Sequence, residues 1–290
     1  MKKLFYILTP ILLILLFIPW YFSSLVLYPP VNCNPEHHVF CDTPKELGLD
    51  YEEVQVVTED GISLPSWFIP AIGSKKGIVL VHGHGGSRNE GLRFASALNK
   101  AGFNLLLLSL RRNAGEFASM GFHEIKDAKA GVKFLSADRQ LDSIGIFGFS
   151  MGAATSIITM EEEPLVKAGL FSSGYASAMD VLSEAANRDF GIPYYPLIPV
   201  VQVYLNVRGD MNIETVRPVD KIGSISPRPI AIFHCNKDDY VDVSHSDRLF
   251  SKAKEPKEIW IPICERHERI WNSHKDEAEK RAVGFFKKNL

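Results

Sequence analysis

The sequence has little charge imbalance, few cysteines and no repeated segments, and each shortage excludes a class of protein. With 32 basic and 34 acidic residues the formal net charge is −2, and no basic cluster extends beyond Lys2 and Lys3 and short helical faces. No nucleic-acid partner is therefore expected. Only 4 cysteines occur, without the close cysteine and histidine spacing that zinc sites require. No internal repeat or low-complexity tract is present.

The N-terminal region contains no charged residue from Leu4 to Tyr28. Such a run is long enough to cross a bilayer as a tilted helix. Lys2 and Lys3 precede it, which favours a cytoplasmic N-terminus with the rest of the chain outside the cytoplasm. A cleaved signal peptide is the alternative, but the run exceeds a usual signal core and no Ala-x-Ala-like site follows it. Residues 1–30 are therefore predicted to be a single-pass membrane anchor.

The cysteines fall into two pairs with different interpretations. Cys33 and Cys41 bracket a short loop and could close a disulfide, which would suit an extracytoplasmic location. Cys235 and Cys264 each end an apolar, strand-like run. They are interpreted as two small buried side chains on neighbouring strands.

Residues 51–290, after a linker at 31–50, alternate between expected strands and helices. Their apolar strands, separated by amphipathic segments, predict an α/β fold with a mostly parallel sheet and helices on both faces. The 46% hydrophobic content of the 290 residues is enough for the core of one such domain. Expected strands are Tyr51–Thr58, Ile62–Ile69, Gly77–Val81, Phe103–Leu110, Ile144–Phe147, Val166–Phe171, Pro229–Phe233 and Glu258–Ile263; expected helices are Glu90–Lys100, His123–Leu135 and Ala153–Met160.

One interval, residues 175–227, is too long for a simple crossover between strands. Its middle is rich in proline and aromatic residues. It is interpreted as a small cap of short helices over the carboxyl edge of the sheet, where open α/β folds bind ligands. Phe190, Tyr194, Tyr195 and Leu197 are expected to shape an acyl pocket there and to influence chain-length preference.

The most informative motif is Gly148-Phe149-Ser150-Met151-Gly152, which lies between an expected strand and an expected helix. Flanking glycines let the backbone turn sharply, so that a serine can project its Oγ from the sheet edge. The amide of Met151 would lie at a helix N-terminus, where it can stabilise an oxyanion. Ser150 is therefore the candidate nucleophile.

Three further motifs follow expected strands: His82–Gly86, Arg111–Glu116 and Phe233–Val241. Together with the Ser150 motif they resemble the α/β-hydrolase superfamily, and the resemblance extends from about Tyr51 to the C-terminus. The first looks like the superfamily's oxyanion loop. The second occupies the place of its Arg-Gly-x-Gly-x-Ser turn but lacks the first glycine. The third is similar to its acid loop, with cysteine in place of a glycine.

The resemblance implies a catalytic triad in the order serine, acid, base. Asp238 is the implied acid, with Asp239 as the alternative. His267 is the implied base, with His274 as the alternative, although His274 is expected at the start of the C-terminal helix.

Other histidines are expected in lesser roles. The backbone amide of His84, with that of Met151, is the implied oxyanion hole. His82 and His234 end strands and are interpreted as structural hydrogen-bonding residues. Those at 37, 38, 123 and 245 carry no signal beyond surface or loop positions.

These features favour a membrane-anchored serine hydrolase that cleaves a small or lipid-like acyl ester through an acyl-enzyme. No metal or organic cofactor is required for this chemistry. Two alternatives remain: a catalytically silent member of the fold that binds ligands under the cap, and a thioesterase or peptidase with the same triad. A chain beginning near Asn32 is expected to be soluble and to keep its activity, because every triad motif lies beyond the anchor.

Overall fold

A computed structural model of the protein describes residues 17–290, and its centre is one eight-stranded sheet. The strands are β1 Glu52–Val57, β2 Ser63–Ile69, β3 Lys76–Val81, β4 Asn104–Leu108, β5 Ser143–Phe149, β6 Val166–Ser172, β7 Ile230–Phe233 and β8 Lys257–Trp260. Their order in the sheet is β1-β2-β4-β3-β5-β6-β7-β8. The first two strands form the predicted antiparallel hairpin, and β2 pairs antiparallel with β4. All other neighbours are parallel, because a helical crossover separates each strand from the next.

Helices cover both faces of the sheet, as its nearly continuous apolar strands require. The helices are α2 Pro35–His38, α3 Leu92–Lys100, α4 Glu124–Lys133, α5 Met151–Glu162, α6 Ala178–Phe190, α7 Leu197–Arg208, α8 Pro218–Lys221, α9 Ser244–Lys252 and α10 Ile270–Asn289. One apolar core lies between the sheet and α4, α5 and α8, and the other between the sheet and α3 and α10.

The expected elements are present, although most of their boundaries shift by one to three residues. The helix expected from Glu90 begins at Leu92, after a 3-10 turn. Helix α4 ends at Lys133 and continues as a π-helical turn. Strand β8 ends at Trp260, because the following segment departs from the sheet to form a loop with an isolated bridge between Lys237 and Glu265.

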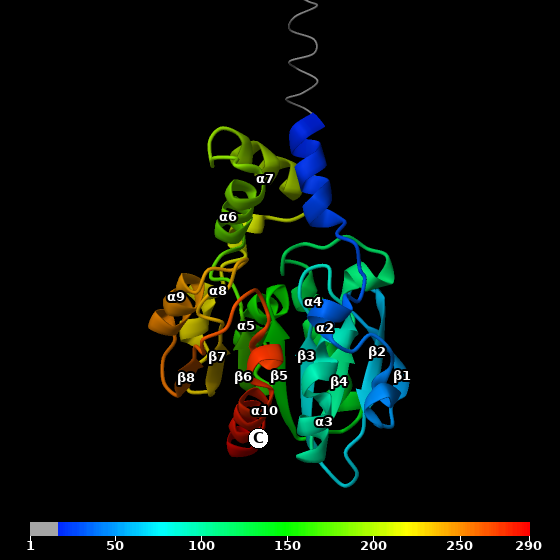
Figure 1. The fold of residues 1–290 in the computed structure, drawn as a ribbon. Helices are drawn as coiled ribbons and strands as arrows, with labels where there is room; N and C mark the ends of the chain where they lie inside the picture. The colour runs from blue at the N-terminus through cyan, green and yellow to red at the C-terminus, as the bar shows by residue number, and fades with distance from the viewer. Residues whose placement is uncertain (1–16) are drawn as a thin grey trace, which may run out of the picture.

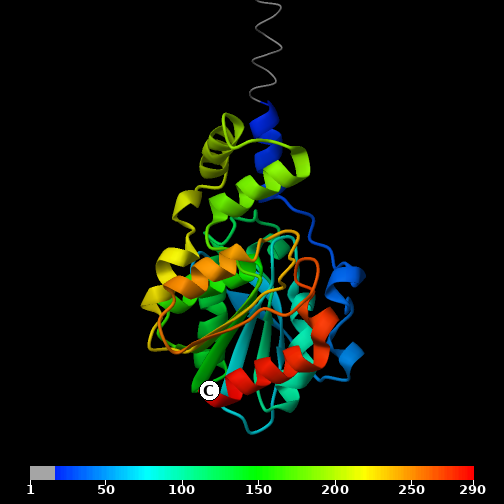
Figure 2. The ribbon, with the colours of Figure 1, turned by 60° about the vertical axis from the view of Figure 1, so that its left-hand side comes forward.

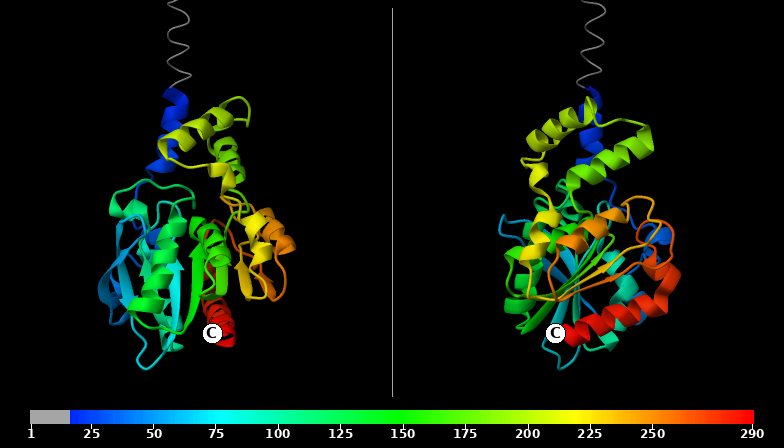
Figure 3. Two further views of the ribbon diagram at one scale, coloured as in Figure 1. Left: turned by 180° about the vertical axis from the view of Figure 1, so that it is seen from behind. Right: turned by 90° about the vertical axis from the view of Figure 1, so that its left-hand side faces the viewer.

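A helical layer stands at the carboxyl edge of the parallel strands (Figures 1 and 2). Residues 175–227 form helices α6 and α7, of 13 and 12 residues, and the four-residue α8, so two helices of this interval are longer than expected. Residues 17–27 are also helical and lie beside α6 and α7 in every view (Figure 3). Within residues 17–290, no helix is both long and apolar enough to cross a membrane. The first part of the predicted anchor, residues 1–16, lies outside the described residues.

Both cysteine pairs are disulfide-bonded. Cys33 and Cys41 form the bridge considered from their spacing, with Cα atoms 5.5 Å apart. Cys235 and Cys264 are also bridged, with Cα atoms 5.0 Å apart, so their interpretation as free buried side chains was wrong. Strands β7 and β8 are parallel neighbours in a register that brings the segments after them together.

Candidate active site

Ser150 occupies the turn between β5 and α5 in a strained conformation. Its φ and ψ are 51° and −116°, outside the regions that non-glycine residues favour. Strain of this kind costs about 1–3 kcal/mol and persists only where the surrounding structure imposes it. A Cβ on Gly148 would collide with the backbone of Gly152, and one on Gly152 with the backbone of Val81. Both glycines are therefore needed for the close packing of the turn.

A chain of hydrogen bonds joins Ser150, His267 and Asp238. The Oγ of Ser150 lies 2.8 Å from Nε2 of His267. The Nδ1 of the same ring lies 2.8 Å and 3.0 Å from the two carboxylate oxygens of Asp238. The acceptors at Nδ1 are carboxylate oxygens, so Nδ1 carries the proton and Nε2 is left to accept one from Ser150.

The alternative acid and base occupy different positions. Asp239 accepts the backbone N–H of His267 at 2.9 Å, so its carboxylate holds the loop rather than the imidazole. His274 lies at a kink inside α10, where its ring packs against Trp260. Among the four candidates, the geometry brings only Asp238 and His267 into line with Ser150.

Charges around the chain of hydrogen bonds favour an ionised Asp238. Burial by itself would raise the pKa of its carboxyl, but hydrogen bonds from His234 and His267 outweigh burial and hold that pKa well below its usual range. Burial by itself would lower the pKa of His267, but the bond and the charge of Asp238 raise it above the ordinary value. An ionised Asp238 in this position favours the protonated form of the His267 ring.

The loop predicted to hold the oxyanion lies beside Ser150. An ideal Cβ on Gly83 would stand 3.2 Å from the Cβ of Ser150, and the Gly83 N–H is donated to Glu90 Oε2 at 2.7 Å. His84 shares a cavity wall with Ser150, and Met151 is the first residue of α5. The oxyanion roles of the His84 and Met151 amides stay predictions.

Sequence reasoning missed a buried ionic network next to this loop. Glu90 Oε1 contacts Arg93 at 3.1 Å and His37 Nε2 at 3.3 Å. Arg93 also donates to the backbone oxygen of Glu268 at 2.7 Å, next to His267 in the chain. Glu90 and Arg93 thus connect the oxyanion loop to the segment that carries the imidazole. An acidic and a basic residue at i and i+3 near a helix start were the available signal.

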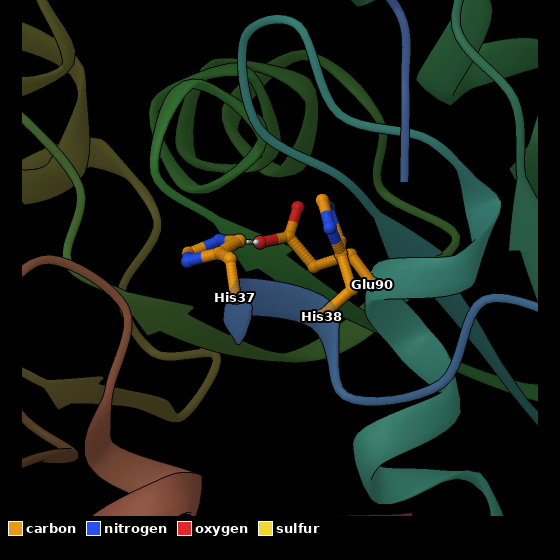
Figure 4. Close-up of side chains that lie close together, drawn as sticks. All are labelled: His37, His38 and Glu90. Carbon is orange, nitrogen blue, oxygen red and sulfur yellow. Dashed lines mark hydrogen bonds and ion pairs between the residues drawn. The ribbon is translucent and has the colours of Figure 1, made fainter. Parts of the chain in front are cut away.

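His37, His38 and Glu90 could offer ligand atoms to a metal ion, since one atom from each lies within 4.8 Å of the others (Figure 4). The carboxylate of Glu90 is already engaged by the Gly83 amide and by the guanidinium of Arg93. A cation there would also face the positive charge of Arg93 at close range. The group is better explained as a hydrogen-bonding network.

Two of the remaining histidines match their expected roles, and His245 does not. His82 accepts the Leu110 N–H, and His234 bonds Ser246 and the backbone oxygen of Val241, in line with structural roles. His245 is fully buried and accepts the Ala176 N–H, which corrects its assignment to the surface.

His123 lies in the bend before α4, a loop position as expected. His123 contacts the backbone oxygen of Gly209 at 2.9 Å. His37 and His38 line the cavity that contains Ser150, so they too were wrongly set aside.

One cavity contains the serine, and a second cavity shares His84 with it. A polar one of about 210 Å³ is lined by Ser150, His267, Glu268 and the oxyanion loop. An apolar one of about 250 Å³ lies under α6 and α7. Phe190 and Leu197 line the apolar cavity as expected. Tyr194 and Tyr195 are not among its lining residues and are exposed, which corrects that part of the prediction.

Known proteins share this architecture. No family model matches the sequence. The chain resembles an esterase of Pyrococcus furiosus, Pf2001, with a TM-score of 0.73 and 26% identity over 91% of this chain and 98% of that one. It also resembles WAV2 of Arabidopsis thaliana, named as an α/β-hydrolase domain-containing protein, with 25% identity over 73% of this chain and 69% of that protein. The chain therefore resembles proteins of the α/β-hydrolase superfamily in both fold and sequence.

Other relatives carry less functional information. An uncharacterised protein of Bacillus subtilis, YqkD, is 26% identical over 72% of this chain and 70% of its own length. A dienelactone hydrolase of Anabaena variabilis shares the fold, with a TM-score of 0.61 and 16% identity over 83% of this chain and 99% of that one. The dienelactone hydrolase shows the shared fold alone, and the Pyrococcus furiosus esterase supports a hydrolase of the α/β-hydrolase fold.

Proposed function

We propose that the protein is a serine hydrolase that cleaves carboxylic esters through an acyl-enzyme. The observation that carries the proposal is the continuous chain of hydrogen bonds from Ser150 Oγ through the His267 ring to Asp238. Ser150 is a weak nucleophile at its ordinary pKa, and His267 Nε2 accepts its proton as Oγ attacks the carbonyl carbon. Asp238 holds the ring and stabilises the imidazolium.

The rest of the reaction follows from the same groups. The oxyanion binds the backbone amides of His84 and Met151, at about 3 kcal/mol for each donor in comparable sites. His267 then gives its proton to the leaving alcohol, and the C–O bond of the ester breaks. Water, deprotonated by the same imidazole, attacks the acyl-enzyme and releases the acid and Ser150.

The experiment compares two serine variants of α5 and its preceding turn. Ser150→Ala removes the nucleophile and is expected to lower the kcat for p-nitrophenyl butyrate by on the order of 10⁴ or more. Ser156→Ala removes a buried hydroxyl of the same helix that has no hydrogen-bond partner among the described residues, and should leave kcat unchanged. Turnover by Ser150→Ala at the wild-type rate would refute the proposal. Turnover of thioesters or peptides but not esters would favour the related hydrolase classes.

We also propose that the domain is anchored in a membrane and faces an oxidising compartment. Lys2, Lys3 and the uncharged residues that begin at Leu4 support the anchor, whereas residues 17–27 of the same run lie against the cap. Two disulfides support the compartment, because cytosolic thiols are kept reduced. Protease added to intact spheroplasts should digest the domain while cytoplasmic markers survive. Complete protection until lysis would place the domain in the cytoplasm.

A further inference from the structure

The apolar cavity has two walls that are distant in sequence. Phe22, Leu25 and Val26 of the N-terminal helix form one wall, and side chains of α6 and α7 that include Leu182 and Val201 form the other. The ring of Phe22 packs edge-on against that of Phe190 with centroids 4.9 Å apart. Without the N-terminal helix, this cavity of about 250 Å³ would be an open groove.

The cavity shares one lining residue with the candidate active site. His84 lines both the apolar cavity and the polar cavity that contains Ser150 and His267. Tyr240 also lines the apolar cavity, and its ring centroid is 5.4 Å from that of His267. A carbonyl at Ser150 would therefore have an apolar space on one side and a polar space on the other.

The N-terminal helix is fastened to the domain by hydrogen bonds and by burial. The His84 ring donates from Nε2 to the backbone oxygen of Val26 at 2.7 Å, since a carbonyl can only accept. Leu27 is 0% exposed, and its backbone oxygen accepts the Ala118 N–H at 2.8 Å. Arg208 of α7 donates to the backbone oxygen of Trp20 at 2.8 Å. One of these contacts holds the residue whose amide is proposed to bind the oxyanion.

We propose that the apolar cavity binds the acyl chain of the substrate, and that the N-terminal helix is a wall of the substrate site that sets chain-length preference. This inference rests on the proposed ester hydrolysis at Ser150. The acyl chain extends from the carbonyl between the N-terminal helix and α6, and the leaving alcohol departs through the polar cavity. The substrate class is an ester of an extended aliphatic acid.

The test changes the volume of the cavity from each wall. Leu25→Trp and Leu182→Trp fill the apolar cavity, and Leu25→Ala enlarges it. Val207→Trp is the control, because Val207 lies on α7, is 77% exposed and does not line the cavity. The full-length protein is assayed in detergent with p-nitrophenyl acetate, octanoate and dodecanoate. One methylene in an apolar pocket changes kcat/KM by about 10-fold or more.

Both tryptophan variants should lower the ratio of octanoate to acetate kcat/KM at least about 10-fold while acetate hydrolysis changes little. Leu25→Ala should raise the ratio of dodecanoate to octanoate, and it tests the cavity even where a tryptophan variant fails to fold. The control should match the wild type. Unchanged ratios in Leu25→Ala and in the folded tryptophan variants would overturn the inference while leaving ester hydrolysis intact. A wild type that hydrolyses none of the esters would overturn the proposed function, and the inference with it.

Discussion

The disulfide between Cys235 and Cys264 should contribute strongly to the free energy of unfolding, and removing it tests whether the two segments are bridged. Each cysteine lies three residues before a proposed catalytic residue, Asp238 or His267. The bridge closes a segment with a sequence separation of 29. Loop-closure entropy assigns about 3.6 kcal/mol to a loop of this length at 25 °C. The bridge between Cys33 and Cys41, with a separation of 8, is assigned about 2.5 kcal/mol.

A double-mutant cycle measures this contribution directly. Cys235→Ala and Cys264→Ala each remove the whole bridge, so the double variant should be scarcely less stable than either single variant. The expected coupling energy is about 3.6 kcal/mol, obtained from guanidinium unfolding followed by circular dichroism without reductant. Thiol titration in denaturant should find no free thiol in the wild type. Additive losses within about 0.5 kcal/mol would instead mean two independent buried thiols and would refute the bridge.

Three further predictions follow from the geometry of the site. Gly148→Ala should abolish folding or activity, because the added Cβ would collide with the first turn of α5. Gly284→Ala has open space around the added Cβ and should stabilise the protein by about 0.4–1 kcal/mol, measured by thermal unfolding. Asp238→Asn should lower kcat by on the order of 10⁴. Asp239→Asn should lower kcat only slightly, because its amide oxygen can still accept the backbone N–H of His267. Steady-state kinetics on one ester distinguishes the two variants. The neutral His267 ring is the proposed base, and its pKa is raised above the ordinary value of 6.5. We therefore expect kcat/KM to fall as the pH drops, with an inflection above 6.5. An inflection below pH 6.5 would contradict this.

Local patterns predicted most of the domain correctly. Continuous apolar strands and amphipathic helices are properties of short segments, and so is the glycine pair around Ser150. Asp238 and His267, by contrast, were selected by the resemblance to the α/β-hydrolase superfamily, and the structure brings both side chains to Ser150. Their mutual contact then follows from the parallel sheet, which brings the carboxyl ends of β5, β7 and β8 to one edge.

Contacts between distant segments were beyond such patterns. The Cys235–Cys264 bridge depends on the register between β7 and β8, which no short pattern specifies. The involvement of His37 depends on how residues 31–50 fold back to Glu90. The docking of residues 17–27 on the cap has no local signal either. It revises the expectation for a chain beginning near Asn32, because that chain would lack one wall of the apolar cavity.

The central claim is that Ser150 is a nucleophile activated by His267, and covalent labelling tests it most directly. The full-length protein is treated with a fluorophosphonate, and intact mass and peptide mass spectrometry locate the adduct. The account predicts one adduct per chain on Ser150, loss of labelling in Ser150→Ala, and much slower labelling in His267→Ala. An adduct on another residue, or equal labelling of wild type and Ser150→Ala, would contradict it.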